Sequence, residues 1–132
     1  IDEKNGHTSL IGSTPEERAA TRMWVRRIDL GILENLANGF RFAEGQAIFD
    51  GRMTLIPHAA EDLKGIAQEK IGWLDAQMTG KQFICGDRFS LADILLFAFL
   101  EFGEQVGQPL NPENQNIMAW MGRVKNRPSA TA

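Results

Sequence analysis

Apolar residues recur every three or four positions along most of the chain, which is the spacing of one face of an α-helix. The first helical stretch begins after Thr14, a suitable N-cap residue, with Pro15 at the first helical position and Glu17 as the capping-box partner. Gly39 and Gly45 indicate where this helix frays or ends. Its core-facing stripe is predicted to comprise Met23, Trp24, Ile28, Ile32 and Leu36.

Two further helices follow from the same spacing. The earlier one ends before Gly80, and Pro57 either lies in its first turn or kinks it, which the sequence leaves open. Its apolar face comprises Leu63, Ile66, Ala67, Ile71, Leu74 and Met78. The later one is predicted to open at Asn111-Pro112 and to close at Arg127-Pro128. Its apolar face comprises Ile117, Trp120, Met121 and Val124.

The sharpest helix start lies at Ser90. Ser90 and Asp93 have the spacing of a capping box, and Phe89 and Ile94 occupy the two positions of a hydrophobic staple. The sequence is then apolar on every side up to Leu100, which predicts a buried central helix over 90–106. This run of roughly ten residues is far shorter than the ~20 that a membrane-spanning helix needs.

No alternating run of apolar and polar residues is long enough to predict a strand. The predicted fold class is therefore all-α, a helical bundle of four or five helices around the buried central helix. A length of 132 residues fits one domain. We interpret residues 1–13 as a linker and residues 14–132 as the helical domain.

Composition narrows the classes of function. An apolar share of 43% and a charged share of 23% are typical of a folded globular protein. The net charge of −3 gives no electrostatic reason to expect nucleic acid or an anionic membrane as a partner. The single cysteine permits no internal disulfide and suits a reducing compartment, so a cytoplasmic location is expected.

Candidate chemistry is sparse. His7 and His58 lack the spacing of metal ligands, so no metal site is predicted. Cys85 precedes a helix start, but no nearby histidine could act as its base, so a packed thiol is the favoured interpretation. Three arginines share a helical face and form either a solvated stripe or an edge that contacts an anion or a partner: Arg18, Arg22 and Arg26.

The segment ICGDRFSLADILLF at residues 84–97 is preceded by GWLDAQMTGKQF and followed by MGRVKNRPSA. This arrangement resembles the C-terminal helical domain of bacterial cytosolic glutathione transferases. In that family a capping box and staple open the central helix a few residues after a glycine, here Gly86. The closing Arg127-Pro128-Ser129 and the segment LIGSTPEERAATRMWVRRID are similar to the end of a later family helix and to the linker with the first helix. The resemblance extends over residues 1–130.

The resemblance implies a two-domain enzyme that conjugates glutathione, its co-substrate, to small electrophilic substrates. In the family a thioredoxin-like N-terminal domain binds glutathione and supplies the catalytic Tyr, Ser or Cys. Because this chain begins at Ile1 without such a domain, we expect a piece that has no catalytic residue and is inactive alone. The family also implies a homodimer through the first two long helices. As an alternative, domains of this type serve as non-catalytic protein–protein interaction modules.

The resemblance also suggests binding residues. Arg26, two positions after Trp24, matches a position that reaches the glutathione of the neighbouring subunit. Leu33 matches a position near the glutathione sulfur, where an apolar side chain cannot donate a hydrogen bond. Trp24, Arg27 and Phe40 are further candidates for the wall of the electrophile pocket, although aromatic residues at helical spacing are more often part of a core.

Overall fold

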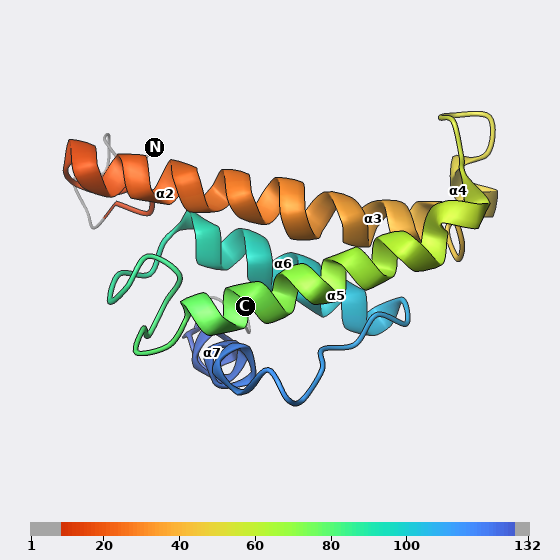
Figure 1. Cartoon of the computed structure of the whole chain (residues 1–132). Helices are drawn as coiled ribbons and strands as arrows, with labels where there is room; N and C mark the ends of the chain where they lie inside the picture. Colours follow the sequence, from red (N-terminus) through yellow and green to blue (C-terminus); the bar gives the residue numbers. More distant parts are fainter. Residues whose placement is uncertain (1–8, 129–132) are drawn as a thin grey trace.

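The longest element of the fold is a nearly continuous helical segment made of α2 (Pro15–Ile28), the π-helical turn η1 (Asp29–Leu33) and α3 (Glu34–Arg41). It forms one long edge of the computed structural model, which describes residues 9–128 (Figure 1). At the π-helical turn, Asn35 Nδ2 donates a hydrogen bond to the Gly31 carbonyl at 2.8 Å. The turn keeps the core stripe in register, since Ile28 and Ile32 are both buried.

The chain then passes through the short α4 (Gln46–Phe49) and η2 (Pro57–Ala59) and returns alongside α3 as α5 (Ala60–Gln77). Pro57 lies in the first turn of η2, which leads directly into α5, so it begins this helical stretch and does not kink it. Gly39 lies inside α3 and is buried. A Cβ atom there would come within 2.7 Å of Lys64 Cγ, so this glycine permits the close approach of α3 and α5.

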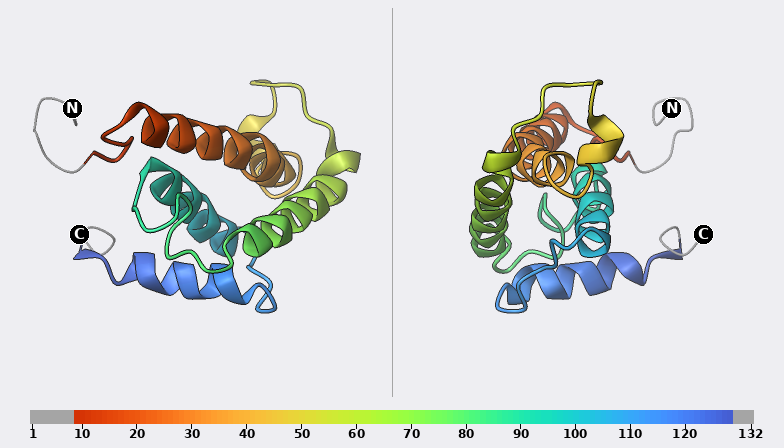
Figure 2. Two further views of the ribbon diagram at one scale, coloured as in Figure 1. Left: turned by 60° about the vertical axis from the view of Figure 1, so that its left-hand side comes forward. Right: turned by 90° about the vertical axis from the view of Figure 1, so that its right-hand side faces the viewer.

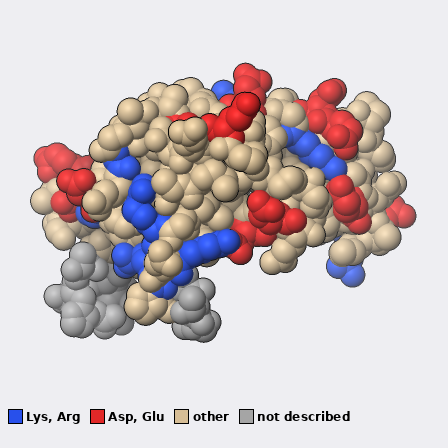
Figure 3. Space-filling model, turned by 90° about the horizontal axis from the view of Figure 1, so that it is seen from below, with Lys and Arg blue, Asp and Glu red and all other residues tan. Residues whose placement is uncertain are grey.

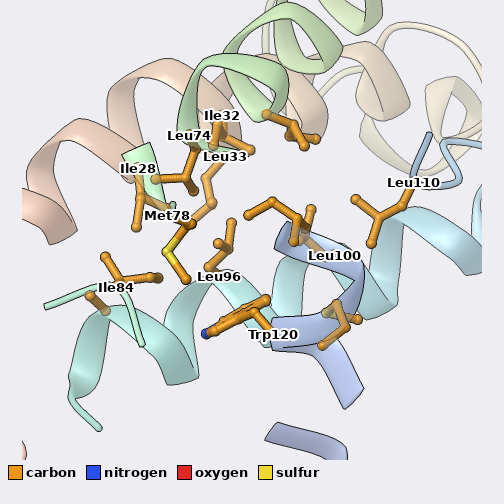
Figure 4. Close-up of a cluster of buried hydrophobic side chains, with 14 of the residues drawn as sticks. Ile28, Ile32, Leu33, Leu74, Met78, Ile84, Leu96, Leu100, Leu110 and Trp120 are labelled. Atoms are coloured by element: carbon orange, nitrogen blue, oxygen red, sulfur yellow. The ribbon is translucent and has the colours of Figure 1, made fainter. Parts of the chain in front are cut away.

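Two further helices complete the bundle, α6 (Leu91–Gln105) and α7 (Gln115–Lys125). Viewed end-on in Figure 2, right, α2–α3, α5, α6 and α7 lie around a common interior. Their apolar faces meet there with the loop between α5 and α6 (Figure 4). The labelled core residues are Ile28, Ile32, Leu33, Leu74, Met78, Ile84, Leu96, Leu100, Leu110 and Trp120.

The fold class predicted from the sequence is confirmed, since the described residues are mostly helical and contain no strand beyond an isolated bridge between Phe83 and Gly86. The predicted central helix, α6, also begins where predicted, directly after Ser90. Within the described range, no helix is both long enough and apolar enough to cross a bilayer. Figure 3 shows charged side chains of both signs distributed over the face seen from below.

Several finer predictions are wrong. Met23 and Ile66 are each 40% exposed and do not belong to the core stripes of their helices. The last helix begins at Gln115, because the residues after Asn111 form a turn in which its Oδ1 accepts from Glu113 N at 3.0 Å. The end of the first helical stretch agrees with its prediction, because α3 ends at Arg41, between Gly39 and Gly45.

The central helix is buried on one side only. Leu91 and Ile94 of α6 are 40% and 39% exposed, and Ala98 is exposed as well. The opposite side contributes Ala92, Leu96 and Leu100 to the core. An apolar run thus does not by itself distinguish a helix enclosed by its own domain from one with a free apolar side.

Candidate functional site

The beginning of α6 is held by a satisfied polar network. Ser90 Oγ accepts a hydrogen bond from Ala92 N at 3.2 Å, and Asp93 Oδ2 accepts one from Ser90 N at 2.8 Å, so the capping box is present. The ring of Phe89 contacts Phe83 and the guanidinium of Arg127. Its packing against the largely exposed Ile94 as a staple stays a prediction.

The Asp93 carboxylate also joins three parts of the chain. It is fully buried, and its Oδ1 accepts hydrogen bonds from Ile84 N at 3.0 Å and from Trp120 Nε1 at 2.8 Å. The loop before α6, the first turn of α6 and α7 therefore meet at one side chain. The partners of this carboxylate are donors of the protein itself, buried within the fold, so its role is structural.

Hydrogen bonds of Arg88, which lies just before α6, connect this end of α6 to the first turns of α2. Arg88 donates hydrogen bonds to the carbonyls of Ile11 and Glu17 and to Thr21 Oγ1, at 3.3, 3.0 and 2.9 Å. Cys85 lies beside them as a half-buried thiol, with its Sγ 3.4 Å from Ser90 Oγ, and packs against the core. These contacts hold the beginning of α6 against α2.

Two hollows lie between α2–α3 and α6. The first, which we call the arginine hollow, has a volume of about 360 Å³ and lies where the two helices begin. Its walls are Ile11, Thr21, Arg22, Val25, Arg26, Asp29 and Leu91. The second, the aromatic pocket, has a volume of about 280 Å³ and lies near their ends. Its walls are Ala37, Phe40, Arg41, Phe49, Ala98, Phe99 and Phe102.

The aromatic pocket is organised around Phe40. This ring meets the rings of Phe49 and Phe102 edge to face, with centroids 6.4 and 5.1 Å apart. Gly45 permits the arrangement, because a Cβ atom at this position would lie 2.8 Å from the Phe40 ring. Phe40, Phe49, Phe99 and Phe102 are all half-buried, so they offer apolar surface without being enclosed by the described chain.

Arg41 provides the cationic group of this pocket. Its guanidinium lies 5.6 Å from the Phe49 ring centroid and donates from Nη1 to Asn38 Oδ1 at 3.0 Å. The pocket has no other ionisable wall residue among those that line it. It can therefore hold a flat apolar group and place one anionic group at Arg41.

An ion pair fastens the chain next to the aromatic pocket. Lys64 Nζ lies 2.6 Å from Glu44 Oε1 and 3.3 Å from Glu61 Oε1. The hydrogen bond with Lys64 lowers the pKa of Glu44, and the same bond raises the pKa of Lys64. Both groups are consequently charged near neutral pH, and the pair links the segment after α3 to α5.

The structure does not bring the predicted binding residues together. Phe40 lines the aromatic pocket, whereas Arg26 lines the arginine hollow, its side chain 71% exposed and 4.0 Å from Asp29. Trp24 is buried against Trp73, at 6.1 Å between centroids. The cations of Arg27 and Lys81 lie 5.1 and 4.7 Å from the Trp24 ring centroid. These side chains line neither hollow.

Leu33 is only 3% exposed and belongs to the core of this chain, and its place near the glutathione sulfur stays a prediction. Sequence reasoning also missed most of the aromatic pocket. Its unpredicted members are Ala37, Arg41, Phe49, Ala98, Phe99 and Phe102. The spacing of Phe99 and Phe102 was the available signal, but an apolar run predicts core and pocket walls equally well.

No metal site is found among residues 9–128, where no three His, Cys, Asp or Glu side chains gather in a suitable group. His58 is exposed in η2. His7, Ser129 and the first eight residues of the predicted linker lie outside the described residues.

Comparisons with known proteins place this fold in a larger context. Glutathione S-transferase 2 of Saccharomyces cerevisiae is 26% identical over 129 residues, which cover 98% of this chain and 55% of that protein. FtsZ-localized protein A of Caulobacter vibrioides is 26% identical over 134 residues, which cover 97% of this chain and 56% of that protein. The chain thus spans about half the length of these curated relatives.

A solved structure shows the same arrangement of helices. The crystal structure of a glutathione S-transferase domain-containing protein from Marinobacter aquaeolei has 30% sequence identity and a TM-score of 0.83, and the match covers 92% of this chain and 59% of that one. The family described as "Glutathione S-transferase, C-terminal domain" matches residues 57–128, from the start of η2 to the end of the described chain. The chain belongs to the glutathione S-transferase C-terminal domain family.

Proposed function

We propose that this chain is the electrophile-pocket and dimerisation domain of a glutathione transferase that conjugates glutathione to electrophilic substrates in the cytoplasm. The observation that carries the proposal is the aromatic pocket between α3 and α6, an apolar hollow of about 280 Å³ in a chain of this family. Such a pocket can hold an apolar electrophile and exclude water from one side of it.

In the proposed reaction the chain contributes binding and orientation. A second, thioredoxin-like domain would bind glutathione and stabilise its thiolate, which is the nucleophile. Phe40 and Phe102 would hold the electrophile in place, so that the two reactants meet at a high effective concentration. Arg26 has a largely exposed guanidinium and is proposed to contact glutathione, as the family resemblance suggests.

The dimer is proposed to form through α2 and α5. Their exposed sides carry large apolar residues, including Met23 at 40% and Trp73 at 42% exposure. The Trp73 ring packs against the buried Trp24 ring, which restricts its position. In the longer protein, Trp73→Glu should shift the species seen by sedimentation velocity from dimer to monomer, whereas an unchanged dimer would contradict this interface.

The transferase proposal is tested by comparing two lengths of the protein. A longer form that contains a glutathione-binding domain should conjugate glutathione to a model chloroarene, measured by the absorbance of the product. The 132-residue chain should show no rate above the uncatalysed one. Equal activity of the two forms would contradict the assignment of the chemistry to the other domain, and no activity in the longer form would contradict the transferase function.

A second candidate is a non-catalytic protein–protein interaction module. It is favoured by one relative that is named for its localisation with FtsZ and by the exposed apolar residues Leu91 and Ile94 on α6. This candidate predicts no conjugation by the longer form. It also predicts that Ile94→Glu abolishes binding of a protein partner while the fold, followed by circular dichroism, is unchanged.

A further inference from the structure

We propose that the aromatic pocket selects planar aromatic compounds that carry a carboxylate or a similar anionic group, with Arg41 as the residue that determines this specificity. This inference rests on the proposed function, because it names the class of substrate for the same pocket. It is carried by three features of the pocket: its walls, its size and the state of its single cation.

The walls favour a flat ring. Six of the seven lining residues are Ala or Phe, so nearly the whole pocket offers only carbon-bound hydrogens and ring faces. Phe40 stands edge to face with Phe49 and Phe102, at interplanar angles of 87° and 86°. Aromatic rings prefer such offset or edge-to-face contacts, and a planar ligand can add a further one.

The size limits the ligand to a small molecule. A volume of about 280 Å³ lies just below the ~300–1,000 Å³ typical of ligand pockets. One ring or two fused rings with a small substituent suit this space. Glutathione, a tripeptide without an aromatic ring, lacks the apolar group that these walls would bury.

The cation is positioned and lacks a carboxylate partner. Arg41 is half-buried, is oriented by Asn38 and Phe49, and makes no ion pair within residues 9–128. Asn38 occupies one of the five donors of its guanidinium, so enough donors remain for a bidentate carboxylate. The acidic group next along the chain, Glu44, is held by Lys64 at 2.6 Å.

The charge balance therefore suits an anionic ligand. An arginine beside a phenylalanine ring in a partly desolvated pocket attracts a carboxylate more strongly than it would in open solvent. A neutral ring of the same shape would fill the same walls but leave the guanidinium without a charged partner. The expected specificity is thus a preference for the acid over its neutral isostere.

The test compares three probes on the full 132-residue chain by isothermal titration calorimetry. 2-Naphthoate carries ring and charge, 2-naphthamide the ring alone, and glutathione carboxylates without a ring. The unaltered chain should bind 2-naphthoate about tenfold more tightly than 2-naphthamide, as expected for one charge-assisted contact at a half-buried site. Glutathione should bind more weakly than either.

Variants assign this preference to Arg41. Arg41→Met should bring the ratio of the two affinities to about one, and Arg41→Lys, which keeps the charge but loses the planar fork, should give an intermediate ratio. Arg52→Met is the matched control, since Arg52 is exposed and outside the pocket, and it should leave the ratio unchanged. Circular dichroism of each variant reports whether the fold is retained.

A ratio that stays near tenfold in Arg41→Met, a ratio near one in the unaltered chain, or no binding of either naphthalene would each overturn the proposal. Because no probe needs to react, these results are independent of conjugation. A longer protein that conjugates a neutral chloroarene while its ratio is one would retain the proposed function and lose this inference. If the longer protein selected 2-naphthoate but conjugated nothing, this inference would be retained and the proposed function lost.

Discussion

At the beginning of α6, the Asp93 carboxylate is fully buried and accepts hydrogen bonds from Ile84, Ser90 and Trp120. Towards the end of the same helix, Phe99 and Phe102 are half-buried and face a hollow. Removing a buried carboxylate that has several donors lowers the free energy of unfolding strongly. Truncating a half-exposed ring lowers it much less. The comparison indicates that one end of α6 holds the fold together and the other is free to take a ligand.

The largest effect is expected at the buried carboxylate. Asp93→Ala leaves the Ile84 and Ser90 N–H groups and the Trp120 indole without an acceptor, and should lower the free energy of unfolding by about 3–5 kcal/mol. Urea denaturation followed by tryptophan fluorescence measures it. Asp93→Asn keeps one carbonyl oxygen as an acceptor and should lower the free energy of unfolding by less. A loss below about 1 kcal/mol for the alanine variant would contradict the structural role given to this carboxylate.

An intermediate effect is expected at the pocket. Phe102→Ala should lower the free energy of unfolding by only about 1–2 kcal/mol, less than the ~3–5 typical of a fully buried Phe, but should weaken 2-naphthoate binding about tenfold. Leu96→Ala, on the buried side of the same helix, is the control and should show a large stability loss with unchanged binding by the folded fraction. The opposite pattern would place the ligand elsewhere.

The smallest effect is expected at the ion pair beside the pocket. Because the ion pair lowers the pKa of Glu44, it stabilises the folded state above the ordinary carboxylate pKa. This stabilisation is lost as the pH falls through the lowered value. The raised Lys64 pKa gives stability that is present below the ordinary lysine pKa and is lost as the pH rises through the raised value. The pair therefore stabilises the fold across the neutral range.

Glu44→Gln should cost less than about 1 kcal/mol at pH 7, because Glu44 is 43% exposed and solvent screens the pair. The difference from the unaltered chain should vanish only when the pH falls below the lowered Glu44 pKa, where the carboxyl group of the folded protein is protonated. Denaturant titrations at pH 7 and over a series of acidic pH values measure this difference. Glu61, which is farther from Lys64 and 86% exposed, provides the matched control Glu61→Gln, with a smaller effect.

Local patterns predicted more of the fold than of the site. Thr14 caps α2 as expected, since its Oγ1 accepts from Glu17 N at 3.1 Å. The carboxylate of Glu17, however, accepts from Ser13 N instead of Thr14 N. Capping depends on neighbouring residues and is visible in a sequence. Which of several plausible donors a side chain reaches depends on the path of the backbone, which a residue pattern does not specify.

The candidate site depends on distant parts of the chain. Phe40, Phe49 and Phe102 belong to three different helices, and only their packing brings them together. The family resemblance suggested Phe40, but it also suggested Leu33, which the structure buries in the core. An apolar residue at helical spacing fits a core and a pocket wall alike, so this distinction required the arrangement of the helices.

The claim that only the later part of α6 and its neighbours bind an aromatic ligand can be measured directly. In a chain with ¹³C-labelled alanine methyl groups, titration with 2-naphthoate should shift Ala37 and Ala98, which line the pocket. The signals of Ala67 and Ala92, which are fully buried in the core, should stay in place. Shifts at Ala92 with none at Ala98, or equal shifts at all four, would contradict the division of α6 into a structural end and a binding end.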